Sequence, residues 1–121
     1  MRIFKSTWFA RFADKEGITD YELKEAVNLL EAGLPDADLG GDVYKLRLAR
    51  PGEGKAGSYR VIVFFRSKRR TFYVYGFAKA KRGNITEKEL KIYKKDAKVD
   101  FSLTDEQINN YLKNRTWIEV L

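Results

Sequence analysis

Four basic side chains in apolar, strand-like segments are the residues best suited to do chemistry. Lys45 and Arg47 alternate with apolar neighbours, and Arg60 and Lys79 lie in two later segments of the same character. RNA is cleaved without a metal when its own 2′-hydroxyl attacks the adjacent phosphate, which requires a base, a cation on the phosphate and an acid for the leaving oxygen. A lysine crowded by cations has a lowered pKa and can act as a base, whereas arginine stays charged. These four residues could form such a site, although each alone could be a solvated strand-end cation.

Two reactive residue types are missing from the sequence, since it contains no histidine and no cysteine. Their absence excludes the commonest general acid or base, thiolate nucleophiles, disulfides and thiolate metal sites. Any catalysis must therefore use Lys, Arg, Tyr, Asp or Glu, and we expect neither a metal nor a cofactor. Because no segment has the roughly 20 apolar residues of a membrane helix, and no secretory signal is evident, we expect a cytoplasmic protein without a membrane partner.

The net charge of +7 is concentrated in the middle third of the chain. Residues 42–82 carry twelve Lys and Arg against only Asp42 and Glu53, whereas residues 1–41 are acidic and residues 83–121 are balanced. A concentrated positive field recruits a polyanion such as a nucleic acid. The alternative is an ordinary solvated face. Because so few acids are available to pair with them, we expect these cations to stay at the surface.

Hydrophobic periodicity predicts helices at both ends of the chain. A short strand at residues 2–5 should lead into a brief helix capped by Ser6 or Thr7, with Trp8, Phe9 and Phe12 in the core. Capping boxes, in which a threonine is followed three residues later by Glu or Gln, predict three further helices. They begin at Thr19, Thr86 and Thr104.

A period of two predicts three strands between these helices, at residues 43–50, 58–66 and 71–79. Residues 67–70 form a hairpin turn, and pairing Arg66 with Thr71 sets the register. This register gives one apolar face, which should pack on the helices, and an opposite face of cations and aromatic rings. The opposite face suits single-stranded RNA, because unpaired bases stack on rings. It could equally be a second core covered by the apolar tail at residues 117–121. The side chains predicted to bind RNA are basic or aromatic: Arg50, Lys55, Tyr73, Tyr75, Lys81 and Arg82.

Three motifs follow one another in the middle of the chain: a strand with Lys-x-Arg at residues 45–47, a glycine-rich loop at 52–57 and Gly-x-Tyr-Arg at 57–60. Together they resemble the RelE-like toxins of bacterial toxin-antitoxin pairs. The resemblance is closest to the HigB-type, phage-derived branch and covers nearly the whole chain. It implies a single domain over residues 1–121 with a compact, microbial-RNase-like α+β fold. Such a fold has an antiparallel sheet of about four strands packed by two N-terminal helices, with additional C-terminal helices.

The resemblance also implies an activity and partners. Members of the family cleave mRNA in the ribosomal A site and are neutralised by an antitoxin encoded alongside, here expected to be a helix-turn-helix protein. Arg60 corresponds to the family's arginine on the scissile phosphate, and Lys45 and Arg47 to its basic strand. The sequence departs from the family where Ala80 replaces an arginine after the last strand. It also lacks the catalytic tyrosine expected soon after, since Tyr93 lies further along on a predicted core face.

Two other functions remain open at this point. The same fold serves ParE-like toxins, which bind DNA gyrase and cleave nothing, so the fold cannot decide the chemistry. A non-catalytic nucleic-acid-binding module would also use a basic face. The dense basic cluster favours the mRNA endonuclease.

Overall fold

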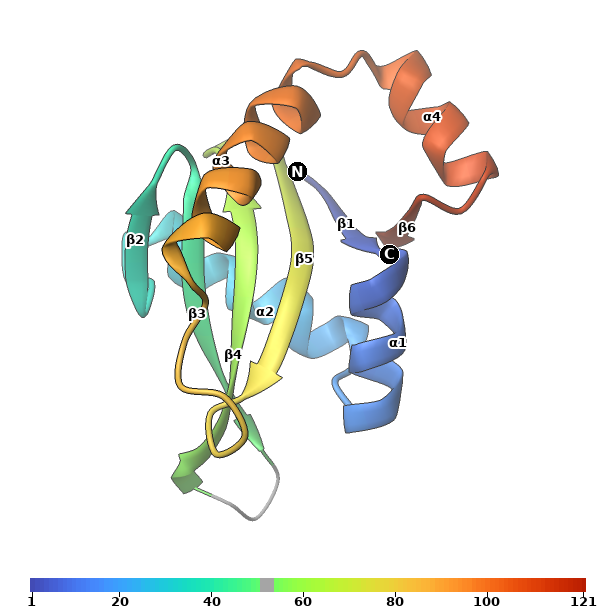
Figure 1. Cartoon of the computed structure of the whole chain (residues 1–121). Coiled ribbons are helices and arrows are strands. Elements are labelled where there is room, and N and C mark those ends of the chain that lie inside the picture. Colours follow the sequence, from blue (N-terminus) through green and yellow to red (C-terminus); the bar gives the residue numbers. More distant parts are fainter. Residues whose placement is uncertain (51–53) are drawn as a thin grey trace.

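The computed structural model describes residues 1–50 and 54–121, in which one mixed sheet carries helices on both of its faces. The helices and strands follow one another along the chain as shown in Figure 1: β1 Arg2–Ser6, α1 Thr7–Glu16, α2 Asp20–Glu31, β2 Ala37–Gly40, β3 Val43–Arg50, β4 Gly54–Phe65, β5 Arg70–Ala78, α3 Glu87–Ser102, α4 Asp105–Lys113 and β6 Trp117–Val120. None of the helices in the described ranges has the length and apolar character needed to cross a membrane.

The sheet is larger than the sequence predicts. Its described strands number six, in the order β2-β3-β4-β5-β1-β6, with β1 parallel to β5 and every other pair antiparallel. The prediction of about four antiparallel strands is therefore wrong in number and in the direction of β1. The two strands that it missed, β2 and β6, are four residues each. β6 pairs with β1 from the other end of the chain, which local periodicity does not reveal. β2 is too short for its alternation to stand out, and it pairs irregularly with β3, which follows it after two residues.

The predicted helix starts are confirmed. The side chain of Ser6 accepts a hydrogen bond from the backbone N–H of Phe9 at the start of α1. Complete capping boxes open the three later helices at Thr19, Thr86 and Thr104. One core prediction for α1 is wrong, because Trp8 is 45% exposed while Phe9 is fully buried.

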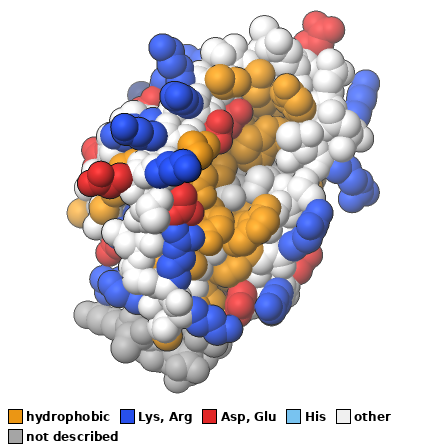
Figure 2. All heavy atoms as spheres, viewed as in Figure 1, with side chains coloured by type: hydrophobic (Ala, Val, Ile, Leu, Met, Phe, Trp, Pro, Cys, Tyr) orange, Lys and Arg blue, Asp and Glu red, His pale blue; other side chains and the backbone are white. Residues whose placement is uncertain are grey.

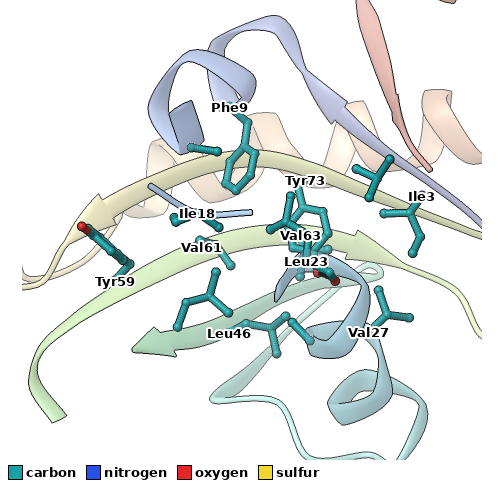
Figure 3. Packing of buried hydrophobic residues seen from close by; sticks show 14 of the residues in the cluster. Ile3, Phe9, Ile18, Leu23, Val27, Leu46, Tyr59, Val61, Val63 and Tyr73 are labelled. Carbon is teal, nitrogen blue, oxygen red and sulfur yellow. Dashed lines mark hydrogen bonds between the residues drawn. The ribbon is translucent and has the colours of Figure 1, made fainter. Parts of the chain in front are cut away.

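Both faces of the sheet are covered, so the protein has two apolar clusters. Helices α1 and α2 cover one face, where Phe9 and Leu23 pack with Leu46 and Val63 from the strands (Figure 3). Helix α3 covers the other face, and the cluster there includes aromatic residues from β1, β5, α3 and β6: Phe4, Phe72, Phe101 and Trp117. The alternative of a second core is thus correct for the part of this face that carries Ile62, Phe64 and Phe72. Its cover is α3 with Ile108 of α4, while the expected covering tail is strand β6.

The β4–β5 hairpin has a different register from the predicted one. Thr71 pairs with Phe65 instead of Arg66, because the backbone of Arg66 closes the turn with Arg69 and Arg70. A shift of one residue exchanges the two faces of a strand. Tyr73 therefore points toward α2, is fully buried and donates a hydrogen bond to the carbonyl of Leu23 at 2.7 Å. Its prediction as an RNA-binding residue is wrong.

A β-bulge in the same hairpin returns the residues that follow it in β5 to the face predicted for them. The register shifts between Ile62 and Val63, so that Tyr75 lies opposite Ile62 and packs against the α3-side cluster. Tyr75 and Phe77 therefore share a face with Arg60, as predicted. Phe72, before the bulge, lies on the α3-side face, although it was expected on the face that packs on α1 and α2.

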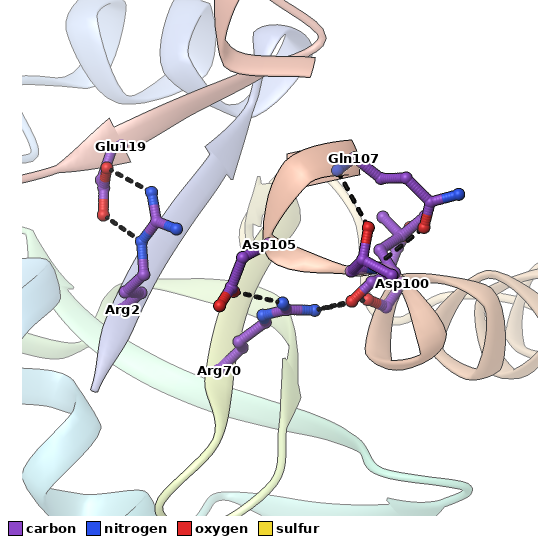
Figure 4. A network of polar contacts seen from close by, with 8 residues as sticks. Arg2, Arg70, Asp100, Asp105, Gln107 and Glu119 are labelled. Atoms are coloured by element: carbon purple, nitrogen blue, oxygen red, sulfur yellow. Dashed lines mark hydrogen bonds and ion pairs between the residues drawn. The ribbon is translucent and has the colours of Figure 1, made fainter. Parts of the chain in front are cut away.

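Two arginines hold the C-terminal elements against the sheet (Figure 4). Arg70 is 9% exposed, donates to the carbonyl of Leu103 at 2.6 Å and pairs with Asp105 at 2.8 Å. Arg2 of β1 pairs with Glu119 of β6 at 2.8 Å. With this corner fixed, α4 stands away from α3, and an apolar hollow of about 390 Å³ opens between them (Figure 2).

Asp100 lies in this hollow and should make stability depend on pH. Burial raises the pKa of its carboxyl from 3.8 to about 7, and the charge of Asp96 adds to the shift. Between these values the folded protein binds a proton that the unfolded chain does not, so this carboxyl lowers stability as the pH rises from about 4 to about 7. We expect Asp100→Asn to be more stable than wild type at pH 8 by about 1 to 2 kcal/mol, since water in the open hollow screens the charge.

Urea unfolding at pH 8 and at pH 4 measures this effect. The advantage of Asp100→Asn should disappear at pH 4, where Asp100 of the wild type is protonated in the folded state. Glu106→Gln, which removes an exposed carboxylate from α4, is the control and should change stability at neither pH. A constant difference between Asp100→Asn and wild type at both pH values would show that the carboxyl does not titrate as described.

Candidate functional site

Arg60 is the centre of the basic cluster and lies in the middle of the sheet. On the α3-side face its neighbours across the strands are Arg47 of β3 and Phe77 of β5. Only 5% of Arg60 is exposed, contrary to the expectation that these cations stay at the surface. A buried guanidinium must be paired, and its partner comes from outside the basic segment.

Asp36, in the link between α2 and β2, is that partner. Its carboxylate lies 3.4 Å from Nε of Arg60 and 3.3 Å from an Nη of Arg47, so one acid bridges two arginines. Ser58, on the same strand face as Arg60, accepts a further hydrogen bond from the guanidinium. The two arginines and Asp36 together carry one net positive charge, and Arg47 is the accessible member, with 43% of its side chain exposed.

The structure brings together some of the four predicted catalytic residues. Arg47 and Arg60 meet through Asp36, and Lys45 lies two residues along β3 on the same face, with its ammonium 3.5 Å from Oδ1 of Asn84. Lys79 follows β5, and its backbone N–H donates to the carbonyl of Ser58 at 3.3 Å. Its exposed side chain forms no ion pair or hydrogen bond with the rest of the described chain. Lys45 thus lies on one strand that flanks Arg60, and Lys79 lies directly after the other.

Arg82 anchors the segment after β5 to α3 and to Tyr75. Its guanidinium lies over the ring of Tyr75, donates to the Tyr75 hydroxyl at 2.8 Å and pairs with Glu89 of α3. The hydrogen bond with Arg82 lowers the pKa of the Glu89 carboxyl, and the same bond raises the pKa of Arg82. Arg82 is therefore already committed to an internal pair, whereas Lys81 is exposed.

The remaining predicted contacts have mixed outcomes. The side chains of Arg50 and Lys55 lie outside the described residues. Tyr93 is on a core face, as predicted, where it packs against Phe64 and Tyr75, and burial raises its pKa to about 12.

Asp36 and Ser58 were missed by the sequence reasoning. Asp36 lies in the short link after α2, and no sequence motif indicates that its side chain reaches β4. Ser58 could have been found, because it lies two residues before Arg60 and strand alternation puts both side chains on one face. The assembled site offers a buried guanidinium with its donors oriented, an accessible second guanidinium and flanking lysines. Such an arrangement can bind a phosphate oxyanion and stabilise added negative charge on it.

One known protein family matches nearly the whole chain. The family described as the RelE toxin of the RelE / RelB toxin-antitoxin system matches residues 1–120. The matched range includes every helix and strand described above.

Proposed function

The chain belongs to the RelE toxin family, and from this premise we propose that it is a ribosome-dependent mRNA endonuclease of the HigB-type branch. Toxins of this family pair with an antitoxin, generally inhibit translation and are generally endoribonucleases. We further propose that this chain acts in the cytoplasm on mRNA in the ribosomal A site. Its antitoxin would be a helix-turn-helix protein encoded alongside.

The arginine pair on Asp36 is the observation that supports a phosphate site. Nε of Arg60 and an Nη of Arg47 converge on the two oxygens of one carboxylate. A non-bridging phosphate edge presents two oxygens in a similar way, and arginine binds such edges through paired hydrogen bonds. Asp36 therefore keeps the two guanidiniums oriented before the RNA arrives.

The reaction that fits these residues is internal transfer of the phosphate. A base removes the proton of the 2′-hydroxyl, the 2′-oxygen forms a bond to phosphorus, and the bond from phosphorus to the 5′-oxygen breaks. An acid protonates the departing 5′-oxygen, which leaves a 2′,3′-cyclic phosphate and a 5′-hydroxyl. Arg60 and Arg47 stabilise the charge that grows on the non-bridging oxygens. The candidates for base and acid are Lys45 on β3 and Lys79 directly after β5.

Induced expression in a bacterium tests this function. We expect arrested protein synthesis and new mRNA 5′ ends within codons in frame. Growth arrest with gyrase-linked DNA damage and no new mRNA ends would instead favour the ParE-like alternative. RNA binding without any cleavage on ribosomes would favour the non-catalytic module.

Neutralising Asp36 should strengthen the binding of nucleic acid. Asp36→Asn removes the one carboxylate that the two arginines share, so more of their charge is available to a phosphate. We expect the affinity for a short single-stranded RNA to rise about threefold to tenfold at low salt. Fluorescence anisotropy measures the change, and Asp42→Asn, which unpairs the exposed Arg66, is the matched control. Weaker binding by Asp36→Asn would mean that orienting the two guanidiniums matters more for binding than the positive charge that Asp36 neutralises.

A further inference from the structure

A second groove lies beside the arginine site, where β5 has no strand neighbour on its β1 side. The pairing of β1 with β5 reaches only Lys5 and Tyr73, and the chain then turns into α1. Residues 75–78 of β5 therefore lie next to α1, and the groove between them has a volume of about 440 Å³. This volume is within the range of small-ligand sites.

Aromatic rings form the wall of this groove. Trp8 of α1 stacks on Tyr75 with ring centroids 4.5 Å apart, and on Phe12 at 5.6 Å with an angle of 12° between the ring planes. The inner rings are held in place by packing, while 45% of Trp8 is exposed. A rigid ring that is supported from behind and open in front is suited to stack on a flat, unpaired base.

The charges that line the groove favour a polyanion. Arg11, Lys15 and Lys81 line it and form no ion pair or side-chain hydrogen bond with other described residues. Glu16 is the one acid that lines the groove among the described residues, and its carboxylate accepts a hydrogen bond from the Tyr59 hydroxyl at 2.9 Å. An apolar ligand would gain nothing from these unpaired cations, and a positively charged ligand would be repelled by them.

The groove and the arginine site are neighbours in the sheet. Phe77 lines the groove and is the direct cross-strand partner of Arg60. A single-stranded RNA whose phosphate lies on Arg60 can therefore place an adjacent base over this edge of β5.

We propose that the groove is a base-stacking subsite, in which an unpaired base next to the phosphate on Arg60 stacks on Trp8 while Arg11, Lys15 and Lys81 hold the flanking phosphates. This subsite rests on the proposed function, since it receives the RNA on which the nuclease acts. Helical periodicity predicted Trp8 as a core residue, so a role in binding was not expected from the sequence.

Tryptophan fluorescence tests the stacking directly. The chain has two tryptophans, and Trp117 is buried, so Trp117→Phe leaves Trp8 as the single reporter. Titration with a short single-stranded RNA should quench Trp8, whereas an abasic strand with the same phosphates should bind without quenching. In the otherwise wild-type chain, Trp8→Ala should weaken binding of the RNA about tenfold and leave binding of the abasic strand unchanged. Trp8→Phe should bind the RNA more tightly than Trp8→Ala and more weakly than wild type.

Tyr21→Ala is the matched control, because Tyr21 is an exposed aromatic residue on α2, outside the groove, and should have no effect. Unchanged Trp8 fluorescence with bound RNA, or equal losses for the RNA and the abasic strand in Trp8→Ala, would overturn the proposal. So would a Trp8→Ala variant that binds RNA normally but has lost its antitoxin, which would make the groove a protein-docking surface. Quenching without cleavage on ribosomes would reject the nuclease while keeping the stacking subsite.

Discussion

Arg60→Ala should lower the rate of mRNA cleavage on ribosomes by about a hundredfold to a thousandfold, as expected for loss of a preorganised donor to a developing oxyanion. The guanidinium is buried and fixed by Asp36 and Ser58, so no mobile side chain can replace it. Arg60→Lys keeps the charge but loses the planar pair of donors. We expect it to retain more activity than Arg60→Ala but less than a tenth of the wild-type rate. The initial rate of cleavage of a defined mRNA on programmed ribosomes measures both variants.

Arg66→Ala is the control for Arg60→Ala. Arg66 follows the last residue of β4 and also pairs with an aspartate, Asp42, at 2.8 Å, but its pair is exposed and lies away from the site. Its loss should change the rate by less than twofold. Urea unfolding shows whether each variant is folded at the assay temperature. A folded Arg60→Ala with the same rate as Arg66→Ala would remove Arg60 from the mechanism.

Gly76→Ala should destabilise the fold by about 2 to 3 kcal/mol, the cost of overpacking a filled contact. A Cβ at this position would lie 2.4 Å from Cε2 of Phe12, because the ring of Phe12 lies directly on the backbone of β5. The ring has little room to move away, since it also packs against Phe9 and Trp8 and forms a T-shaped pair with Tyr59. The free energy of unfolding in urea measures this change.

Two further variants separate this collision from a general effect of replacing glycine. Gly83→Ala should be neutral, because no atom of the described residues lies within 4 Å of the place that its Cβ would take, and its φ angle is ordinary. Gly76→Ala combined with Phe12→Leu should be more stable than the sum of the two single changes predicts. Additive losses would show that the ring of Phe12 is not the obstacle.

The helices and the main strands were predicted because their signals are local. Each of the three predicted capping boxes opens a helix, since a threonine and an acid or amide three residues later satisfy each other's backbone groups. The hairpin register was not predicted correctly. Phe64, Phe65, Phe72 and Tyr73 are all apolar enough for either face, so the pattern allowed a shift of one residue, and the turn at residues 66–70 decided it.

Strand alternation predicted the part of the candidate site that lies on β3 and β4. Alternation placed Lys45, Arg47 and Arg60 on one face, and the structure places them there. It did not reveal that α3 covers much of this face, because an amphipathic helix does not show which surface it will bury. Asp36 reaches the arginine site, and Trp8 the neighbouring groove, through the topology of the sheet. No local sequence pattern marks either residue for this role.

The end groups of mRNA cleaved by the purified protein test the central claim most directly. Wild type and Arg60→Ala would be incubated with a defined mRNA, with and without programmed ribosomes, and the new 3′ ends identified. The proposed chemistry predicts 2′,3′-cyclic phosphates at A-site codons, only with ribosomes and only with wild type. New 3′-hydroxyls paired with 5′-phosphates, or cyclic phosphates formed equally well by Arg60→Ala, would contradict it.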